Sequence, residues 1–126
     1  MAHPVDELLS KWTEAMRRSD TAKLVSLVTE DSEFWSPGQP PLAGREAVRQ
    51  SFEALFKNYR MEQAFEETER IDFGESVLLR GAEHNVITPR KGVGETTIHQ
   101  RVFTLARCDA DGVWRFARGI SQFLAP

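Results

Sequence analysis

At 126 residues, with 40% hydrophobic and 28% charged residues, the chain has the size and composition of one soluble globular domain, residues 1–126. Its formal net charge of −3 and its scattered basic residues exclude the basic stripe that binds a nucleic-acid backbone. No apolar run approaches the ~20 residues of a membrane helix, and the N-terminal residues lack the apolar core of a signal peptide, so we expect a cytoplasmic protein with no membrane partner.

The first part of the chain has the pattern of two helices. Pro4 suits the first position of a helix, and acidic residues follow it where the helix dipole favours carboxylates. Apolar residues then repeat at helical spacing as far as Met16, before the basic pair at 17–18. Asp20 suits the N-cap of a short second helix, in which the apolar repeat runs through 24–28. Because the two helices are nearly continuous, we expect a bent hairpin.

A short strand, a rigid loop and a third helix are expected next. Residues 32–36 have strand character, and the Pro/Gly-rich segment 37–41 cannot belong to a helix or a central strand. From Gly44 the helical repeat returns and predicts a helix that ends near Lys57.

Beyond residue 60 the pattern changes to strands separated by turn sequences. The turns divide this part of the chain into four antiparallel strands at approximately 60–72, 76–88, 95–108 and 113–124. Strands of this length predict a strongly twisted, curved sheet that wraps around the helices, which is an α+β fold.

Neither face of this sheet has the clean alternation of a face exposed to water. In 113–124, for example, both alternating sets of residues mix apolar and polar side chains. The simplest arrangement places the helices on the concave face and the sheet of a second subunit on the convex face. The sequence therefore predicts a homodimer through the sheet face.

Three segments of the chain resemble one known family. LVTEDSEFWSPG at 27–38 resembles the family's acidic segment that leads into a Pro/Gly turn, GREAV at 44–48 the start of its third helix, and DGVWRF at 111–116 the entry into its last strand. Together they resemble the SnoaL-like and ketosteroid-isomerase-like branch of the nuclear-transport-factor-2 superfamily. The resemblance implies a cone-shaped α+β fold with three N-terminal helices packed in a curved, mainly antiparallel sheet around a pocket. Members of this superfamily include isomerases, dehydratases, polyketide cyclases, epoxide hydrolases and dimerisation domains, so the fold does not specify the reaction.

The likeness to ketosteroid isomerase can be examined at three positions. That enzyme uses an aspartate base at the end of the first short strand, a tyrosine on the first helix and a protonated aspartic acid. The corresponding positions here are Ser36 and Trp12, and the strand region 96–106 has no Asp or Glu. Ser36 cannot act as an unassisted base near neutral pH, and Trp12 offers only an indole N–H donor. The ketosteroid-isomerase mechanism is therefore disfavoured, which leaves a different constellation on the same scaffold.

The polar candidates for such a constellation are Tyr59, Glu83, His84, Asn85, His99, Arg101, Arg118 and Gln122. His84 and His99 lie in the middle of two predicted strands, where one imidazole could act as a base near neutral pH. The alternative is that either histidine is a polar residue of the covered convex face, at a dimer interface. The face that they occupy depends on strand register, since one bulge reverses it.

Metal and cofactor chemistry is not predicted. Two histidines without a third positioned ligand are a weak metal signal. The single cysteine, Cys108, excludes an internal disulfide and cannot by itself build a thiolate metal site, so we expect a small apolar filler near a turn.

Two arginines of the predicted strands, Arg101 and Arg118, lie in apolar surroundings, where a guanidinium needs a carboxylate. That carboxylate is either a protein group such as Glu83 or Glu33, or it belongs to an anionic ligand. The acidic pair at 30–31 follows the second helix and is expected to be a solvated cap or turn.

These patterns predict a pocket protein that binds a small, largely apolar or carbonyl-containing molecule. Its enzymatic form would be a cofactor-free isomerase, cyclase or dehydratase, with His99 or His84 as the catalytic residue. The predicted ligand-binding residues are Trp12, Phe34, Ser36, Phe56, Tyr59, Arg101, Trp114, Arg118 and Gln122. The alternative is a non-catalytic dimerisation or protein-binding module of the same fold, in which the polar strand residues belong to a subunit interface.

Overall fold

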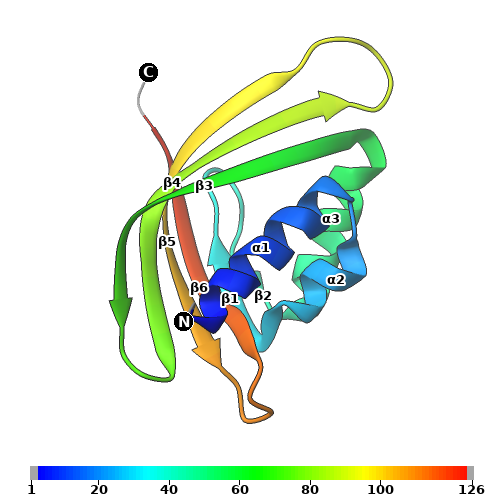
Figure 1. Ribbon diagram of the computed structural model, residues 1–126. Coiled ribbons are helices and arrows are strands. Elements are labelled where there is room, and N and C mark those ends of the chain that lie inside the picture. The colour runs from blue at the N-terminus through cyan, green and yellow to red at the C-terminus, as the bar shows by residue number, and fades with distance from the viewer. Residues whose placement is uncertain (1–2, 125–126) are drawn as a thin grey trace.

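The computed structural model describes residues 3–124, so that four terminal residues of the predicted domain, 1–2 and 125–126, lie outside it. Three helices lie in the concave side of one curved sheet, as Figure 1 shows. The helices are α1 (Pro4–Arg17), α2 (Thr21–Ser26) and α3 (Arg45–Asn58). The strands are β1 (Val28–Trp35), β2 (Leu42–Ala43), β3 (Tyr59–Asp72), β4 (Ser76–Pro89), β5 (Thr96–Cys108) and β6 (Trp114–Phe123). The predicted α+β class with helices inside a curved sheet is confirmed.

The sheet has six strands in the order β2-β1-β6-β5-β4-β3. All neighbouring strands are antiparallel except β1 and β6, which run parallel. The four long strands begin and end within two residues of their predicted positions. Their boundaries follow from Gly- and Asp-containing turns, which sequence patterns identify well.

The sequence was misleading where α2 meets β1. A helical repeat was expected through Val28 and a strand only from Ser32, but α2 ends at Ser26 and β1 already begins at Val28. Val28 is paired with Phe116 of β6 and is fully buried. This long-range pairing outweighs the local helical spacing. The two-residue strand β2, which pairs with β1 through Ala43 and Glu33, was not predicted either.

Helix α1 is fixed at its first turn to the far edge of the sheet. His3 is the N-cap: its Nδ1 accepts from the Val5 amide at 3.0 Å, and its own amide donates to Asp6 at 3.2 Å. Asp6 also accepts a hydrogen bond of 2.6 Å from Arg70 on β3, and this bond lowers the pKa of the Asp6 carboxyl. The capping residue and the helix–sheet contact thus share one carboxylate.

The curvature of the sheet depends on places where the register shifts. One shift lies between Glu67 and Glu69 of β3, opposite Gly81 of β4. A Cβ at Gly81 would approach the Glu66 carbonyl oxygen to 2.2 Å, so that only glycine fits there. A second shift lies between Leu105 and Ala106 of β5. Such bulges bend strands and increase their twist, which turns the sheet into one wall of a cone.

The core has two parts. The larger one joins α1, β1 and the middle of the sheet, and the smaller one joins the three helices around Met16, Leu24 and Phe56. Within residues 3–124, no helix is both long enough and apolar enough to cross a membrane.

Candidate functional site

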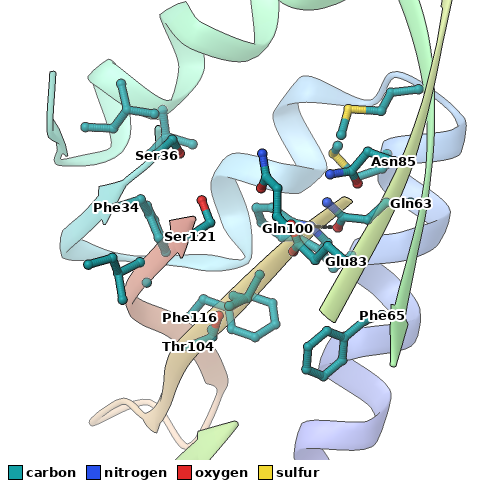
Figure 2. A pocket seen from close by; sticks show the side chains of 18 of the residues that line it. Phe34, Ser36, Gln63, Phe65, Glu83, Asn85, Gln100, Thr104, Phe116 and Ser121 are labelled. Atoms are coloured by element: carbon teal, nitrogen blue, oxygen red, sulfur yellow. Dashed lines mark hydrogen bonds between the residues drawn. The ribbon is translucent and has the colours of Figure 1, made fainter. Parts of the chain in front are cut away.

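A cavity of about 280 Å³ lies between the helices and the concave face of the sheet. Helices α1 and α3, the loop after β1 and strands β3 to β6 all contribute to its walls. Most of the wall is apolar, and its aromatic members are Trp12, Phe34, Trp35, Phe52, Phe65 and Phe116. Figure 2 shows Phe34 and Ser36 on one side of this space and Phe65 on another. An apolar cavity with few polar groups is the usual form of a small-molecule site.

Strand alternation decides which residues enter the cavity. Side chains of a strand point alternately to its two faces, so every second residue of β3, β4 and β5 faces the helices. These inward residues are Met61, Gln63 and Phe65 on β3, Leu79, Glu83 and Asn85 on β4, and Gln100, Val102 and Thr104 on β5. On β6 the inward position Gly119 is paired with Phe34, whose ring would lie 2.9 Å from an added Cβ. Glycine there makes room for the Phe34 ring in the wall.

The Trp12 indole is held in the cavity wall by aromatic and polar contacts. Its ring meets Phe116 edge to face, with 5.4 Å between the ring centres, and Phe52 in the same manner at 5.8 Å. Its Nε1 donates a hydrogen bond of 2.9 Å to Oε1 of Gln63. This bond fixes the Gln63 amide, whose NH₂ group is then its remaining donor.

Glu83 is the one ionisable side chain among the described residues that line the cavity. Burial raises the pKa of its carboxyl, and a hydrogen bond with Asn85 acts in the opposite direction. A carboxylate that is partly removed from water without a basic partner is unfavourable, so this environment shifts the equilibrium of Glu83 toward its neutral form.

Asn85 lies beside Glu83 on the same inward face of β4. Its side chain is 3% exposed, and within the described part of the chain its Oδ1 has no hydrogen-bond partner. Strand register places it opposite Gln63, and it places Glu83 opposite Gln100. Four polar side chains thus gather on the strand side of the cavity, as Figure 2 shows.

Three of the predicted ligand-binding residues, Trp12, Phe34 and Ser36, lie at this cavity. The others do not line it: Phe56, Tyr59, Arg101, Trp114, Arg118 and Gln122. Phe56 is buried in the smaller core, where it stacks on Phe52 with 5.6 Å between ring centres. Tyr59 is exposed at the end of α3, and Trp114 packs against His3 instead. These aromatic residues have structural contacts outside the cavity.

His84 and His99 lie together, but on the outer face of the sheet. They are direct register partners, and their Nδ1 atoms are 2.6 Å apart. Nε2 of His84 is 3.5 Å from the exposed Glu66 carboxylate. Their strand positions have the opposite parity to Glu83, Asn85 and Gln100, so both rings point away from the cavity. The two histidines therefore do not lie inside the pocket, where one was expected to act as a base. Both lie on the convex face, which was the alternative position.

The expected pairing of the two arginines with a carboxylate of the protein is found, within residues 3–124, for Arg118 only, and with Asp31 instead of Glu83 or Glu33. Arg101 donates to Gln122 at 2.8 Å on the outer face and does not meet Glu83. Arg118 meets Asp31, whose carboxylate is 3.7 Å away and whose main-chain oxygen accepts a bond of 2.6 Å. Asp31 is also held by Arg107 at 2.8 Å. Each arginine thus has a partner within the protein.

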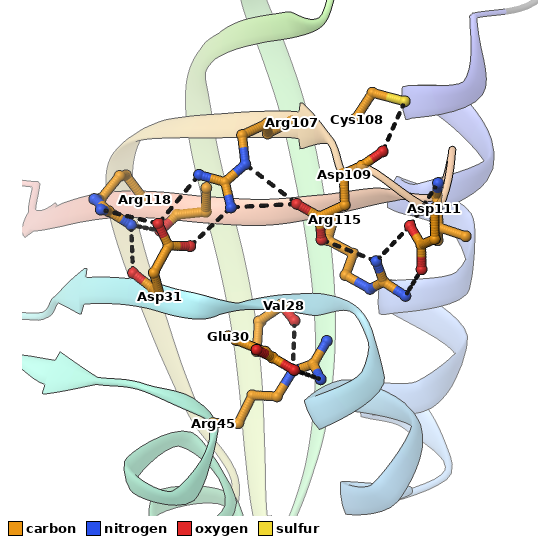
Figure 3. A network of polar contacts seen from close by, with 12 residues as sticks. Val28, Glu30, Asp31, Arg45, Arg107, Cys108, Asp109, Asp111, Arg115 and Arg118 are labelled. Atoms are coloured by element: carbon orange, nitrogen blue, oxygen red, sulfur yellow. Dashed lines mark hydrogen bonds and ion pairs between the residues drawn. The ribbon is translucent and has the colours of Figure 1, made fainter.

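The acidic pair at 30–31 was expected in a solvated cap or turn, but it lies within β1. Figure 3 shows Asp31 between Arg107 and Arg118, while Glu30 lies 3.8 Å from Arg45. The hydrogen bond from Arg107 is the main reason why the pKa of Asp31 falls well below its usual range. This cluster ties β1 to β5 and β6 on the outer side of the sheet.

Sequence reasoning missed several cavity residues, namely Gln63, Phe65, Gln100 and Thr104, and it ranked the histidines above Glu83. A partial signal exists in β4, because Val77, Leu79 and Glu83 share one parity and both aliphatic residues are fully buried. Leu79 and Val77 lie four and six positions before Glu83, and apolar residues at such even spacings are typical of the inner face of a strand. That parity favours Glu83 as the inward residue. The other set of β4, which includes His84, is also largely apolar, with Leu78, Ala82 and Val86, so the sequence does not decide between them.

Metal ligands are not clustered in the part of the chain that the structure describes, since no three His, Cys, Asp or Glu side chains come together there to hold an ion. Cys108 is partly buried next to the turn at Asp109, and its thiol contacts the Asp109 carbonyl oxygen at 3.8 Å.

A model of the SnoaL-like domain matches residues 9–119 of the chain. No curated protein sequence matches it. Many solved structures share its fold. A conserved protein from Planctomyces limnophilus is 24% identical, with a TM-score of 0.85 over 96% of this chain and 95% of that one.

Two further structures lead to the same fold. A ketosteroid isomerase-like protein from Erwinia carotovora atroseptica is 20% identical, with a TM-score of 0.82 over 97% of this chain and 95% of that one. A nuclear transport factor 2-like superfamily protein from Salmonella enterica is 12% identical, with a TM-score of 0.83 over 97% and 89% of the two chains. The predicted cone fold of this superfamily is confirmed.

Proposed function

This chain belongs to the family of SnoaL-like domains, and we propose that its cavity binds a small, largely apolar or carbonyl-containing molecule. The observation that carries the proposal is the cavity itself, about 280 Å³ in volume, with aromatic walls and four polar side chains gathered on the strand side. This volume lies just below the usual range for ligand sites, ~300 to 1,000 Å³, so a small molecule suits it.

A cofactor-free isomerase, cyclase or dehydratase is the enzymatic form of this proposal. One solved structure of the same fold is called ketosteroid isomerase-like, and proton transfer is chemistry that side chains alone can perform. Ser36 and Trp12, which correspond by sequence position to the base and the tyrosine of ketosteroid isomerase, both line the cavity. Glu83 is the ionisable side chain among the described residues of the same cavity. It therefore replaces His84 and His99 as the proposed catalytic residue.

The test is ligand-dependent stabilisation, measured with acetophenone and with a panel of ketones, steroids and aromatic acids. A ligand at ten times its Kd raises the free energy of unfolding by about 1.4 kcal/mol. Val102→Phe fills the cavity from β5 and is expected to remove this stabilisation. His99→Ala combined with Arg101→Ala alters the outer face next to it and is the matched control, in which the stabilisation should persist.

Two results would contradict the cavity as the binding site. One is stabilisation that persists in Val102→Phe, and the other is loss of stabilisation in the outer-face control. A panel in which no compound stabilises the wild-type protein would favour the alternative, a non-catalytic dimerisation or protein-binding module.

A specific observation favours a homodimer through the convex face. Trp35, Ile120 and Phe103 are direct register neighbours across β1, β6 and β5, and they are 52%, 46% and 47% exposed. Trp35 and Ile120 also border the cavity, but their strand positions have the parity opposite to the inward Phe34 and Gly119. Exposed apolar side chains in a row are typical of a surface that another protein covers. A second copy suits it, since a two-fold interface needs only one such surface.

Analytical ultracentrifugation at micromolar concentration tests the homodimer. We expect a dimer for the wild-type protein and a monomer for Phe103→Glu, with Val93→Glu on the β4–β5 turn as a control that remains dimeric. A monomeric wild-type protein would contradict the interface.

The cytoplasmic location stays a prediction, which cell fractionation can test.

A further inference from the structure

The polar side chains of the cavity are concentrated on three neighbouring strands. Gln63 on β3 is the register partner of Asn85 on β4, and Glu83 on β4 is the register partner of Gln100 on β5. The opposite walls contain mostly aromatic and aliphatic side chains. A ligand in this cavity therefore meets amide and carboxyl groups at one end only, whereas the other walls add hydroxyl groups such as those of Ser36 and Ser121. We call Gln63, Glu83 and Asn85 the polar end.

Two members of the polar end have a fixed hydrogen-bonding role. Gln63 uses its Oε1 to accept from Trp12 at 2.9 Å, so that its NH₂ group is left as a donor. Oδ1 of Asn85 is a buried acceptor without a partner among the described residues. An unsatisfied buried acceptor is unfavourable by ~1 to 3 kcal/mol, and a ligand with an O–H or N–H group could satisfy it.

The charge of the third member, Glu83, depends on what faces it. Phe65 faces it from β3 and Gln100 from β5, and all the described helix residues that line the cavity are uncharged. The charged groups of the adjacent strand positions, Glu66, His84 and Arg101, belong to the opposite face of the sheet. No basic group in the described cavity wall compensates a carboxylate, and burial raises the pKa of Glu83. A neutral Glu83 offers one O–H donor and one acceptor.

We propose that the polar end selects a neutral ligand that carries a hydroxyl group next to a carbonyl group. The hydroxyl donates to Oδ1 of Asn85, and the carbonyl oxygen accepts from the Glu83 carboxyl and the Gln63 amide. A carboxylate ligand is rejected, since it would place a second negative charge beside Glu83 without a described basic partner. The apolar body of the ligand packs against Phe34, Phe52 and Phe116. This inference rests on the proposed function and adds the chemical class of the ligand.

Three test compounds of similar size separate the possibilities in calorimetric or NMR titrations of the wild-type protein. α-Hydroxyacetophenone has both groups, acetophenone lacks the hydroxyl, and mandelate carries a carboxylate. We expect α-hydroxyacetophenone to bind about tenfold more tightly than acetophenone, the equivalent of one buried hydrogen bond. Mandelate should bind more weakly than either. The affinity for α-hydroxyacetophenone should fall as the pH rises and Glu83 ionises.

Variants assign these effects to individual residues. Asn85→Leu has a similar volume without the acceptor and should remove the preference for α-hydroxyacetophenone over acetophenone. Glu83→Gln cannot ionise and should make the affinity independent of pH. His84→Gln, one residue away on the outer face, is the control and should keep both the preference and the pH dependence. Thermal unfolding of each variant verifies that it is folded, and the comparison of compounds on the wild-type protein needs no variant.

The possible outcomes are distinguishable. Equal binding of acetophenone and α-hydroxyacetophenone, or tighter binding of mandelate, would overturn the polar end while the cavity remained a ligand site. A preference that survives Asn85→Leu would also overturn it. If none of the three compounds binds to the wild-type protein at millimolar concentration, both this inference and the proposed function for this class of ligand fail.

Discussion

The two faces of the same sheet use similar residues in opposite environments. On the concave face Glu83 is partly buried, with no basic partner among the described residues of the cavity wall, and this burial raises the pKa of its carboxyl. On the outer face Asp31 lies exposed between Arg107 and Arg118, and the bond from Arg107 lowers the pKa of its carboxyl. The first arrangement reduces stability at neutral pH and leaves polar capacity for a ligand. The second satisfies its charges internally and contributes to structure.

The largest expected contrast between the faces comes from two phenylalanines. Phe116 is 5% exposed and lies in both the core and the cavity wall, whereas Phe103 is 47% exposed on the outer face. Phe116→Ala should lower the free energy of unfolding by about 3 to 5 kcal/mol. Phe103→Ala should lower it by less than about 1 kcal/mol. Urea denaturation at a concentration where the protein is monomeric measures both, and equal losses would contradict this contrast.

The curvature that separates the faces can be disturbed at Gly81. Gly81→Val places side-chain atoms against the Glu66 backbone and should lower stability by about 3 kcal/mol, since the backbone must move. Ala82→Val creates the same side chain one residue later, on the outer face, and should change stability by less than about 1 kcal/mol. Chemical denaturation of the pair gives the comparison. A tolerated valine at 81 would show that the sheet can flatten there.

The two carboxyl groups should give opposite pH profiles. Since the folded pKa of Glu83 is raised, the folded state holds the extra proton, and stability falls as the pH rises from about 4 toward that pKa. Glu83→Gln should therefore gain stability relative to the wild-type protein as the pH rises above about 4. Since the folded pKa of Asp31 is lowered, its contribution is present above about pH 4 and is lost as the pH falls below it.

Asp31→Asn should accordingly be less stable than the wild-type protein at pH 7, by less than about 1 kcal/mol because this pair is exposed to solvent. The difference should vanish at low pH. Urea denaturation at several pH values measures both variants, and profiles of the same sign would contradict the contrast between the faces.

The smallest expected effects come from two indoles that each donate one hydrogen bond. Trp12 donates to Gln63 within the cavity wall, and Trp35 donates to Glu33 at 2.6 Å in an exposed position. Trp12→Phe should lower stability by about 1 kcal/mol and free the Gln63 amide. Trp35→Phe should change it by less than about 0.5 kcal/mol, because water replaces the lost partner. Thermal unfolding at fixed pH measures the two variants, and a larger loss from Trp35→Phe would reverse the assignment.

The local pattern of the sequence determined most elements of the fold. Helical spacing predicted α1 and α3, and turn sequences predicted the four long strands, because both signals arise between residues close in the chain. Three motifs in order were enough to indicate the family, which the match over 9–119 confirms. Of the cavity, Trp12 and Ser36 were identified in advance through their correspondence to positions of a known fold, and Phe34 as one of the aromatic residues expected to line it.

Only the tertiary structure decided which face each strand residue occupies. His84 and Glu83 are neighbours in sequence, yet one lies outside and the other inside, and the choice depends on pairing with β3 and β5 and on the bulges beside them. A shift of one residue would exchange the two faces, and no local pattern fixes it when both faces mix polar and apolar residues. The register of the sheet therefore determines which residues line the cavity. The polar end could be identified only after the structure had shown which β4 residues face inward.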